Sequence, residues 1–206
     1  MNKYEKTQYY TSIILKIMIG VLIPISIWRQ SFFLVFASVF VLFLSFLPSI
    51  ISKSFKIKLP TEIDFVVTLV LYLHYFLGEY SGFYLKISWW DLFLHTGNSL
   101  ILGLVGFVVA YSLLLTSRIT AKPFFIAMFS LSFAVFVGVI WEIFEFFADY
   151  FFGFSMQKSG LVDTMTDLIV DTLGALVVSV LGFLYMKHKK KGIIHKILVR
   201  FIDNLK

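Results

Sequence analysis

Six long apolar segments restrict this chain to one broad class of fold. They cover about residues 11–28, 31–51, 62–79, 91–116, 123–147 and 165–186. An apolar helix of about 20 residues crosses the ~30 Å hydrocarbon layer of a bilayer, whereas the strands of a membrane barrel are short runs of alternating polarity. Charged residues make up 15% of the chain, against about 25% in soluble domains. The sequence therefore predicts an all-α, polytopic membrane helical bundle with about six transmembrane helices.

The Lys and Arg residues lie mainly on one side of these spans. If the N-terminus is inside, 14 of the 18 fall in inside segments. The outside segments hold three of them, namely Arg29, Lys86 and Lys158. Because loops rich in Lys and Arg stay in the cytoplasm, this asymmetry predicts that both termini are cytoplasmic.

Residues 187–206 form a basic tail after the last span. Apolar residues recur in it at helical spacing, and Lys196 and Arg200 lie off the apolar stripe. This pattern indicates an amphipathic helix on the anionic cytoplasmic leaflet, with a solvated tail as the alternative. We expect a six-span transmembrane domain over residues 1–186, followed by this tail, with membrane lipids as partners.

Composition also excludes several functions. The chain has no Cys, which rules out disulfides, thiolate catalysis and Cys-based metal sites. The net charge of +6 could suggest a nucleic-acid partner. The charges lie in short loops and in the tail, however, as membrane topology predicts, so we expect no binding to DNA or RNA.

Eight of the 12 acidic residues fall at the ends of four spans. In the predicted orientation, spans three and five end outside the cell and spans four and six begin there, so all eight lie at the extracytoplasmic end. They are Glu79, Asp91, Glu142, Glu145, Asp149, Asp163, Asp167 and Asp171. A carboxylate inside a membrane costs free energy unless it is paired, protonated or metal-bound, and such residues are functional hypotheses by default.

Helical spacing places the polar residues of each span on one face. In span four, Asp91 and His95 are four positions apart. In span five, Glu142, Glu145 and Asp149 stand at i, i+3 and i+7. In span six, Asp163, Asp167 and Asp171 stand at i, i+4 and i+8, and each of these spacings keeps side chains on one face of a helix. Three polar stripes cannot all face lipid, so we expect them to point at one another or at a wet cavity.

Facing carboxylates repel one another and require a compensating proton, cation or metal ion. Carboxylates combined with one or two imidazoles suit Mg, Mn, Fe or Zn. We therefore predict a divalent metal ion bound by residues of the last three spans, namely His95, Glu142, Glu145, Asp167 and Asp171. Glu142 and Glu145 are also the predicted catalytic residues. The predicted supporting residues are His74, Asp91, Asn98 and Asp163.

Each of these residues also has a purely structural interpretation. Asp91 and Asp163 suit the caps of helices, Asp149 suits a loop contact, and His74 suits an interior hydrogen bond. The deepest carboxylates could join helices by hydrogen bonds without any chemistry.

Glycines recur in spans four and six. Small residues let helix backbones approach closely in membranes, so we expect these glycines at contacts between helices. They are Gly97, Gly103, Gly106, Gly174 and Gly182.

Four motifs follow one another in the second half of the chain, namely His74-x3-Gly78, Trp90-Asp91-x3-His95-x-Gly97, Trp141-Glu142-x2-Glu145 and Asp163-Thr164-x2-Asp167-x3-Asp171-x2-Gly174-Ala175. Their order resembles the YjdF-like family of bacterial multi-pass membrane proteins. The resemblance covers about residues 70–182 and implies a location in the bacterial cytoplasmic membrane. That family is largely uncharacterised, so the resemblance implies little about activity.

Asp91 with His95, then Glu142 or Glu145, then Asp167 with Gly174 follow a second pattern. They give the chain a more distant likeness to VanZ-like proteins, which are linked to glycopeptide-antibiotic resistance. The Gln and Arg near the third motif of that family have no counterpart here, where Phe146 and Met165 stand. We therefore do not carry the resistance phenotype over to this chain.

Three functions are open at this point. In the first, a metal-bound water hydrolyses an envelope lipid or its headgroup, with Glu142 or Glu145 as the base. In the second, the chain is a non-catalytic scaffold or lipid-interaction protein whose acidic stripes hold the helices in register. In the third, it is a proton- or cation-coupled transporter, since chains of Asp, Glu and His relay protons across membranes.

Overall fold

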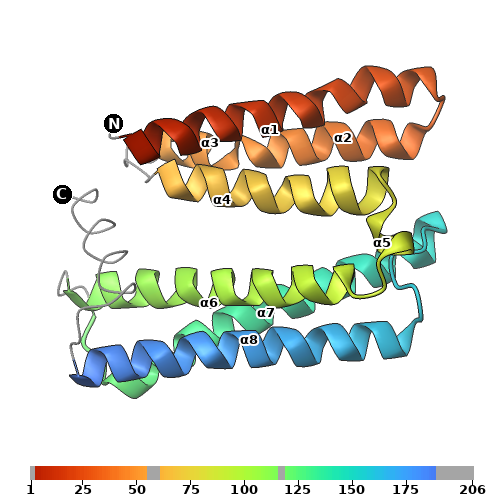
Figure 1. Cartoon of the computed structure of the whole chain (residues 1–206). Coiled ribbons are helices and arrows are strands. Elements are labelled where there is room, and N and C mark those ends of the chain that lie inside the picture. Colours follow the sequence, from red (N-terminus) through yellow and green to blue (C-terminus); the bar gives the residue numbers. More distant parts are fainter. Residues whose placement is uncertain (1–2, 55–60, 116–118, 189–206) are drawn as a thin grey trace. The chain divides into compact units, whose positions relative to one another are not determined.

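The computed structural model describes residues 3–54, 61–115 and 119–188, and every regular element in these ranges is a helix (Figure 1). In chain order the elements are α1 (Lys3–Trp28), α2 (Phe32–Ser45), α3 (Leu47–Ser54), α4 (Thr61–Leu71), η1 (Tyr72–Tyr80), α5 (Phe83–Lys86), α6 (Trp90–Leu115), α7 (Pro123–Phe152) and α8 (Leu161–His188). The chain forms two compact units, which meet in the sequence at Trp90 and Asp91. Unit 1 contains α1 to α5, and unit 2 contains α6 to α8.

Among the described residues, five helices are long and apolar enough to cross a membrane, with α4 and η1 counted as one. The pair α2 and α3, bent by 42°, makes a sixth if it is one span. These findings confirm the predicted all-α, multi-pass architecture. The cytoplasmic position of the termini and the division of the chain at residue 186 stay predictions. Most of the predicted tail, from residue 189 onward, lies outside the described residues.

The helices of unit 2 extend beyond the apolar segments that predicted them. α7 continues to Phe152, where Gly153 adopts a φ of 67° and donates its N–H to the carbonyl of Asp149. α8 begins directly after Gly160, which has a φ of 62°. Glycine tolerates this left-handed conformation, which ends a helix. Hydrophobicity marks only the apolar part of a helix, so Asp149 and Asp163 lie inside helices rather than beside them.

Unit 1 packs α1, α2, α4 and η1 around Ile19, Leu22 and Tyr75. The third predicted span is one continuous helix, in which the α-helix α4 is followed directly by the π-helix η1. A π-helix has a wider turn than an α-helix and is rare. At Gly78 of η1 a Cβ atom would meet the ring of Tyr84, so glycine is required where this ring approaches the helix.

A polar pair lies between α1 and α4 of unit 1, where Lys16 is buried and Asp64 is half-buried. Lys16 Nζ lies 2.7 Å from Asp64 Oδ1 and 2.9 Å from Asp64 Oδ2. Ser12 donates a hydrogen bond to the same carboxylate, and Lys16 Nζ lies 5.0 Å from the ring centre of Phe46. Because lipid offers no partner for either charge, the pair favours one register between the two helices.

Unit 2 is a bundle of α6, α7 and α8 joined by hydrogen bonds from side chains to backbone. Ser130 Oγ of α7 donates to the carbonyl of Gly103 in α6 at 2.6 Å. Ser179 Oγ of α8 donates to the carbonyl of Ala127 in α7 at 2.7 Å. Such short-range bonds require the helices to lie close together, which the small residues permit.

Four of the five glycines predicted at helix contacts do lie at such contacts. A Cβ atom at these positions would meet a side chain of a neighbouring helix, and they are Gly103, Gly106, Gly174 and Gly182. At Gly97 a Cβ atom would find no other atom within 4 Å. The prediction is therefore wrong for Gly97, which faces open space.

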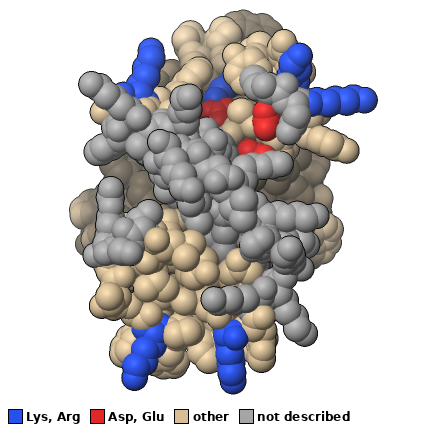
Figure 2. Space-filling model, turned by 90° about the vertical axis from the view of Figure 1, so that its left-hand side faces the viewer, with Lys and Arg blue, Asp and Glu red and all other residues tan. Residues whose placement is uncertain are grey.

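The two ends of unit 2 differ in charge. At one end α7 begins after Lys122 and α8 closes with Lys187, and both side chains are exposed. Figure 2 views the molecule from the side of this end and shows Lys and Arg side chains projecting from it. At the other end α6 and α8 begin and α7 ends, and there the acidic residues of unit 2 gather.

Candidate metal centre

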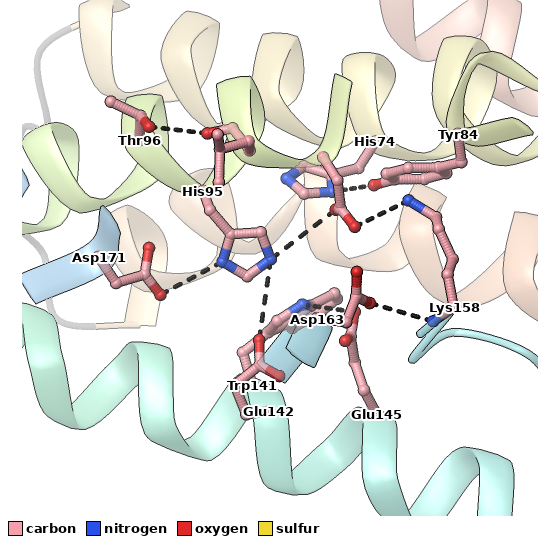
Figure 3. Close-up of polar contacts among 12 residues, drawn as sticks. His74, Tyr84, His95, Thr96, Trp141, Glu142, Glu145, Lys158, Asp163 and Asp171 are labelled. Atoms are coloured by element: carbon pink, nitrogen blue, oxygen red, sulfur yellow. Dashed lines mark hydrogen bonds and ion pairs between the residues drawn. The ribbon is translucent and has the colours of Figure 1, made fainter. Parts of the chain in front are cut away.

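The polar faces of α6, α7 and α8 meet at the acidic end of unit 2 (Figure 3). His95 of α6 lies 3.9 Å from Glu142 of α7 and 3.3 Å from Asp171 of α8, measured between the nearest ring nitrogen and carboxylate oxygen. These contacts bring together three helices that are separated by loops in the sequence. The convergence of the last three spans, predicted from topology and helical spacing, is therefore found in the structure.

Three residues at the centre of this region could hold a metal ion. His95, Glu142 and Asp167 each offer one ligand atom, and these atoms all lie within 4.8 Å of one another. All three residues are buried, with exposed fractions of 4%, 4% and 3% in that order. Glu142 Oε1 and Asp167 Oδ2 have no hydrogen-bond partner. A buried polar atom without a partner is costly, so this group has unused capacity to bind a ligand.

The His95 ring is oriented by the carboxylates on its two sides. Nδ1 lies 3.3 Å from Asp171 Oδ2, and Nε2 lies 3.9 Å from both Glu142 Oε1 and Asp91 Oδ1. If Nδ1 carries the proton and donates it to Asp171, Nε2 keeps its lone pair and faces the unpaired oxygen of Glu142. Metal-bound histidines in proteins are usually held in this way by a carboxylate or carbonyl on the second ring nitrogen.

Gly138 makes room for Asp171, and sequence reasoning missed it. A Cβ atom on Gly138 would stand 2.5 Å from Asp171 Oδ2, closer than any non-bonded contact allows. On α8, Gly174 plays the same part for Ser99 of α6, whose hydroxyl donates to the carbonyl of Thr96. The signal for Gly138 was its place one turn before Glu142, on the polar face of α7.

Glu145 lies one turn nearer the end of α7 than Glu142. It is buried, and its Oε1 accepts a hydrogen bond from Trp141 Nε1 at 2.9 Å. Trp141 and Glu145 are four positions apart, so their hydrogen bond runs along a single face of α7. Glu145 thus stands beside the three-residue group rather than in it, and its predicted roles as ligand and catalyst stay predictions.

Asp91, Asp163 and Asp167 form a second group, which lies next to the first and is more exposed. One carboxylate oxygen from each lies within 4.8 Å of the others. Lys158, from the loop before α8, places its Nζ 2.8 Å from Asp91 Oδ2. The backbone N–H of Lys158 also donates to Asp163 Oδ2 at 3.0 Å. The pairing of Lys158 with Asp91 joins residues far apart in the chain, and no spacing rule could have found it.

Asp149 is occupied by the loop between α7 and α8. Its two carboxylate oxygens accept the backbone N–H groups of Met156 and Gln157, each at 2.8 Å. The same loop is tied to α8 by Gln157 Nε2, which donates to Thr164 Oγ1 at 2.8 Å. Asp149 therefore shapes the loop, as its structural interpretation predicted.

The remaining predicted residues lie outside the metal-capable groups. His74 belongs to η1 of unit 1, where its Nδ1 forms a 2.6 Å hydrogen bond with Tyr84 Oη. This is the interior hydrogen bond that its structural interpretation predicted. Asn98 lies one turn after His95 on α6 and is half-buried. Supporting roles for His74 and Asn98 at the centre stay predictions.

The ligand types and spacing suit a divalent ion after a small contraction. Metal bonds of about 2.1 Å at tetrahedral angles place ligand atoms roughly 3.4 Å apart. The three ligand atoms of His95, Glu142 and Asp167 lie within 4.8 Å of one another, so none of these separations must shorten by more than about 1.4 Å. One imidazole with two carboxylates matches the preferences of Zn, Mn and Fe, and carboxylates alone those of Mg and Mn.

Comparison with known proteins identifies relatives without a known activity. The family model described as "Predicted membrane protein (DUF2238)" matches residues 10–188. An uncharacterized protein of Thermotoga maritima is 32% identical over 128 residues, which make up 60% of this chain and 63% of that protein. The match thus covers less than two thirds of the relative's length. No solved structure shows significant similarity to the chain. The YjdF-like resemblance is compatible with these findings, and the VanZ-like likeness stays a prediction.

Proposed function

Since this chain belongs to the DUF2238 family of predicted membrane proteins, we propose that unit 2 holds a divalent metal ion inside a membrane-spanning bundle. The ligands are His95 Nε2 and carboxylate oxygens of Glu142 and Asp167. The observation that carries the proposal is the pair of buried oxygens, Glu142 Oε1 and Asp167 Oδ2, that lack a hydrogen-bond partner beside the His95 ring. A metal ion bonded to both would remove the cost of leaving them unpaired.

The reaction that fits such a centre is hydrolysis. Three protein ligands would leave coordination positions open for water and substrate. An ion held by these residues would supply a nucleophilic water at neutral pH and would polarise the bond under attack. Because Glu142 would serve as a ligand, we assign the role of general base to Glu145. An envelope lipid or its headgroup is the substrate class, since the centre lies near the ends of apolar helices.

A non-catalytic scaffold is the second candidate, and the polar contacts between helices favour it. His95 and Asp171 join α6 to α8, and the hydroxyls of Ser130 and Ser179 bond to backbone carbonyls of neighbouring helices. These contacts hold the bundle together without an ion. The scaffold predicts that every acidic variant loses stability and that added metal changes nothing.

Transport has less support from the other half of unit 2. The hydroxyls of Ser112, Ser130 and Ser179 are each within 2.7 Å of a backbone carbonyl that accepts their proton. Hydroxyls engaged in this way are poor stations for a water path. Flux driven by a pH gradient in proteoliposomes would revive this candidate.

The test of metal binding uses purified protein at neutral pH. After stripping with a chelator and dialysis against Mn²⁺ or Zn²⁺, we expect about one tightly bound ion per chain at the three-ligand position. Glu142→Gln and Asp167→Asn keep the shape of each side chain and remove its charge. They should weaken binding by more than about 100-fold, because loss of an outer-shell partner alone costs 10–100-fold.

The matched control is Asp149→Asn, which removes an acid of the same helix end whose oxygens bond to the loop. It should bind the ion as wild type does. If wild-type protein binds no divalent ion, the metal proposal is wrong and the scaffold gains support. If the ion binds and Glu145→Gln leaves hydrolysis of envelope lipids unchanged, the assigned base is wrong.

A further inference from the structure

The second acidic group, formed by Asp91, Asp163 and Asp167, shares Asp167 with the group of His95, Glu142 and Asp167. We propose that it binds a second divalent cation through Asp91, Asp163 and Asp167, that Asp167 bridges the two ions, and that the Lys158 ammonium occupies this outer position until the ion displaces it. This inference rests on the proposed function, because the bridge requires an ion at the inner position.

The spacing of carboxylates on α8 supports a shared ligand. Asp163, Asp167 and Asp171 follow one another at intervals of four residues, which is about 6 Å along a helix. Asp163 belongs to the outer group, Asp171 orients His95 at the inner one, and Asp167 lies between them and belongs to both groups. A carboxylate has two oxygens, so one residue in this place can bind an ion on either side.

The state of Asp167 is a second, independent observation. Its side chain is 3% exposed, and its Oδ2 atom has no hydrogen-bond partner. A buried carboxylate oxygen is normally satisfied by a donor. In the two groups, the potential ligand atoms within 4.8 Å of those of Asp167 are a ring nitrogen of His95 and three carboxylate oxygens. The carboxylate oxygens attract cations rather than donate hydrogen bonds.

Lys158 shows that the outer position already attracts a cation. Its Nζ lies 2.8 Å from Asp91 Oδ2, and its own backbone N–H anchors the loop to Asp163. The side chain is 29% exposed, against 15% for Asp91, so the ammonium can leave toward water while the loop stays bonded to Asp163. A removable positive charge on a flexible stem is what a metal ion would replace.

The balance of charge also favours two ions. Six carboxylates belong to the two groups or lie beside them, namely Asp91, Glu142, Glu145, Asp163, Asp167 and Asp171. If all are ionised and His95 is neutral, one divalent ion together with Lys158 leaves three excess negative charges. A second divalent ion that displaces Lys158 leaves two. Uncompensated charge at a partly buried site is expensive, so a second cation lowers the free energy of the assembled centre.

The two positions differ in the ions that they suit. The inner position combines an imidazole with two carboxylates, which favours Zn, Mn or Fe. The outer position has oxygen ligands alone, which favours Mg or Mn. Mn²⁺ suits both, and for that reason it is the probe for the experiment.

The experiment compares Mn²⁺ binding to full-length wild type, Lys158→Met and Asp163→Asn in detergent, by titration calorimetry and by electron paramagnetic resonance. We expect one tight and one weaker Mn²⁺ in wild type, and a second affinity raised at least 10-fold in Lys158→Met. Asp163→Asn should lose the second ion and bind the first within about threefold of wild type. Two Mn²⁺ ions bridged by Asp167, about 4 Å apart, should give an exchange-coupled spectrum.

Lys122→Met is the control, since it removes an exposed positive charge at the opposite end of unit 2. It should leave both affinities unchanged, and an equal gain in this variant would overturn the role of Lys158. A single uncoupled Mn²⁺ in wild type and in Lys158→Met overturns the second position and leaves the inner one standing. Absence of any bound Mn²⁺ overturns the inner centre as well. If Lys158→Met does not fold, Lys158→Gln and the Asp163→Asn arm decide.

Discussion

Replacing Gly138 by alanine tests whether Asp171 positions the His95 ring. The new methyl group would stand 2.5 Å from Asp171 Oδ2. Ordinary van der Waals contact begins at 3.4 Å, so the carboxylate must retreat by about 0.9 Å. The methyl carbon is bonded directly to the α7 backbone and cannot rotate aside, so the side chain of Asp171 on α8 must move.

The size of the effect follows from the contact that is lost. His95 Nδ1 lies 3.3 Å from Asp171 Oδ2, and a hydrogen bond ends at about 3.5 Å. A shift of this size removes the group that orients the ring. Loss of such an outer-shell partner lowers metal affinity by about 10–100-fold. Overpacking adds a destabilisation of about 1–3 kcal/mol, partly offset by the gain of about 1 kcal/mol from Gly→Ala in a helix.

Gly97→Ala is the matched control for this experiment. It makes the same chemical change inside α6, where the new methyl group meets no atom within 4 Å. Calorimetric titration of both variants with Mn²⁺, and their thermal unfolding in the same detergent, separate the clash from the helix propensity. If Gly138→Ala binds Mn²⁺ as tightly as Gly97→Ala and unfolds at the same temperature, the positioning role of Asp171 is refuted.

Two further predictions concern polar contacts away from the metal centre. Lys16→Met in unit 1 should lower the free energy of unfolding by about 3 kcal/mol, because it leaves the carboxylate of Asp64 without its cation, whereas the double variant with Asp64→Leu should recover most of the loss. Unfolding in detergent and denaturant measures both, and equal losses in the two variants would contradict the account. Asp149→Ala should lower the free energy of unfolding by about 1–3 kcal/mol. The variant leaves two backbone N–H groups of the α7–α8 loop without their acceptor. Its Mn²⁺ affinity should stay within about threefold of wild type, and a large loss of affinity would mean that the loop shapes the centre.

The architecture of this protein could be predicted from its sequence with few errors. The length of the apolar segments is set by the thickness of a bilayer, and a helix is the one element that satisfies all of its backbone groups inside a single span. The polar faces followed from the same periodicity, since residues such as Asp163 and Asp167 lie four positions apart. The errors came where hydrophobicity carries no signal, at the ends of α7 and α8 and in the π-helix η1.

The composition of the candidate metal centre could be predicted only in part. His95, Glu142 and Asp167 were identified because charge inside an apolar span is rare and costly. Nothing in one-dimensional spacing separates a ligand from its neighbour on the same face. In the structure Glu145 accepts a hydrogen bond from Trp141, and Asp171 contacts Nδ1 of His95. Which residues make these contacts depends on how the helices rotate and cross.

The sequence by itself determined that the chain crosses a membrane several times and that three of its helices carry acidic stripes, because both properties follow from the local pattern of polarity. Tertiary packing alone decided which atoms meet. Asp171 contacts Gly138, and Lys158 pairs with Asp91. Both contacts join residues on different elements. Their distances depend on interhelical contact and loop geometry, which no local pattern encodes.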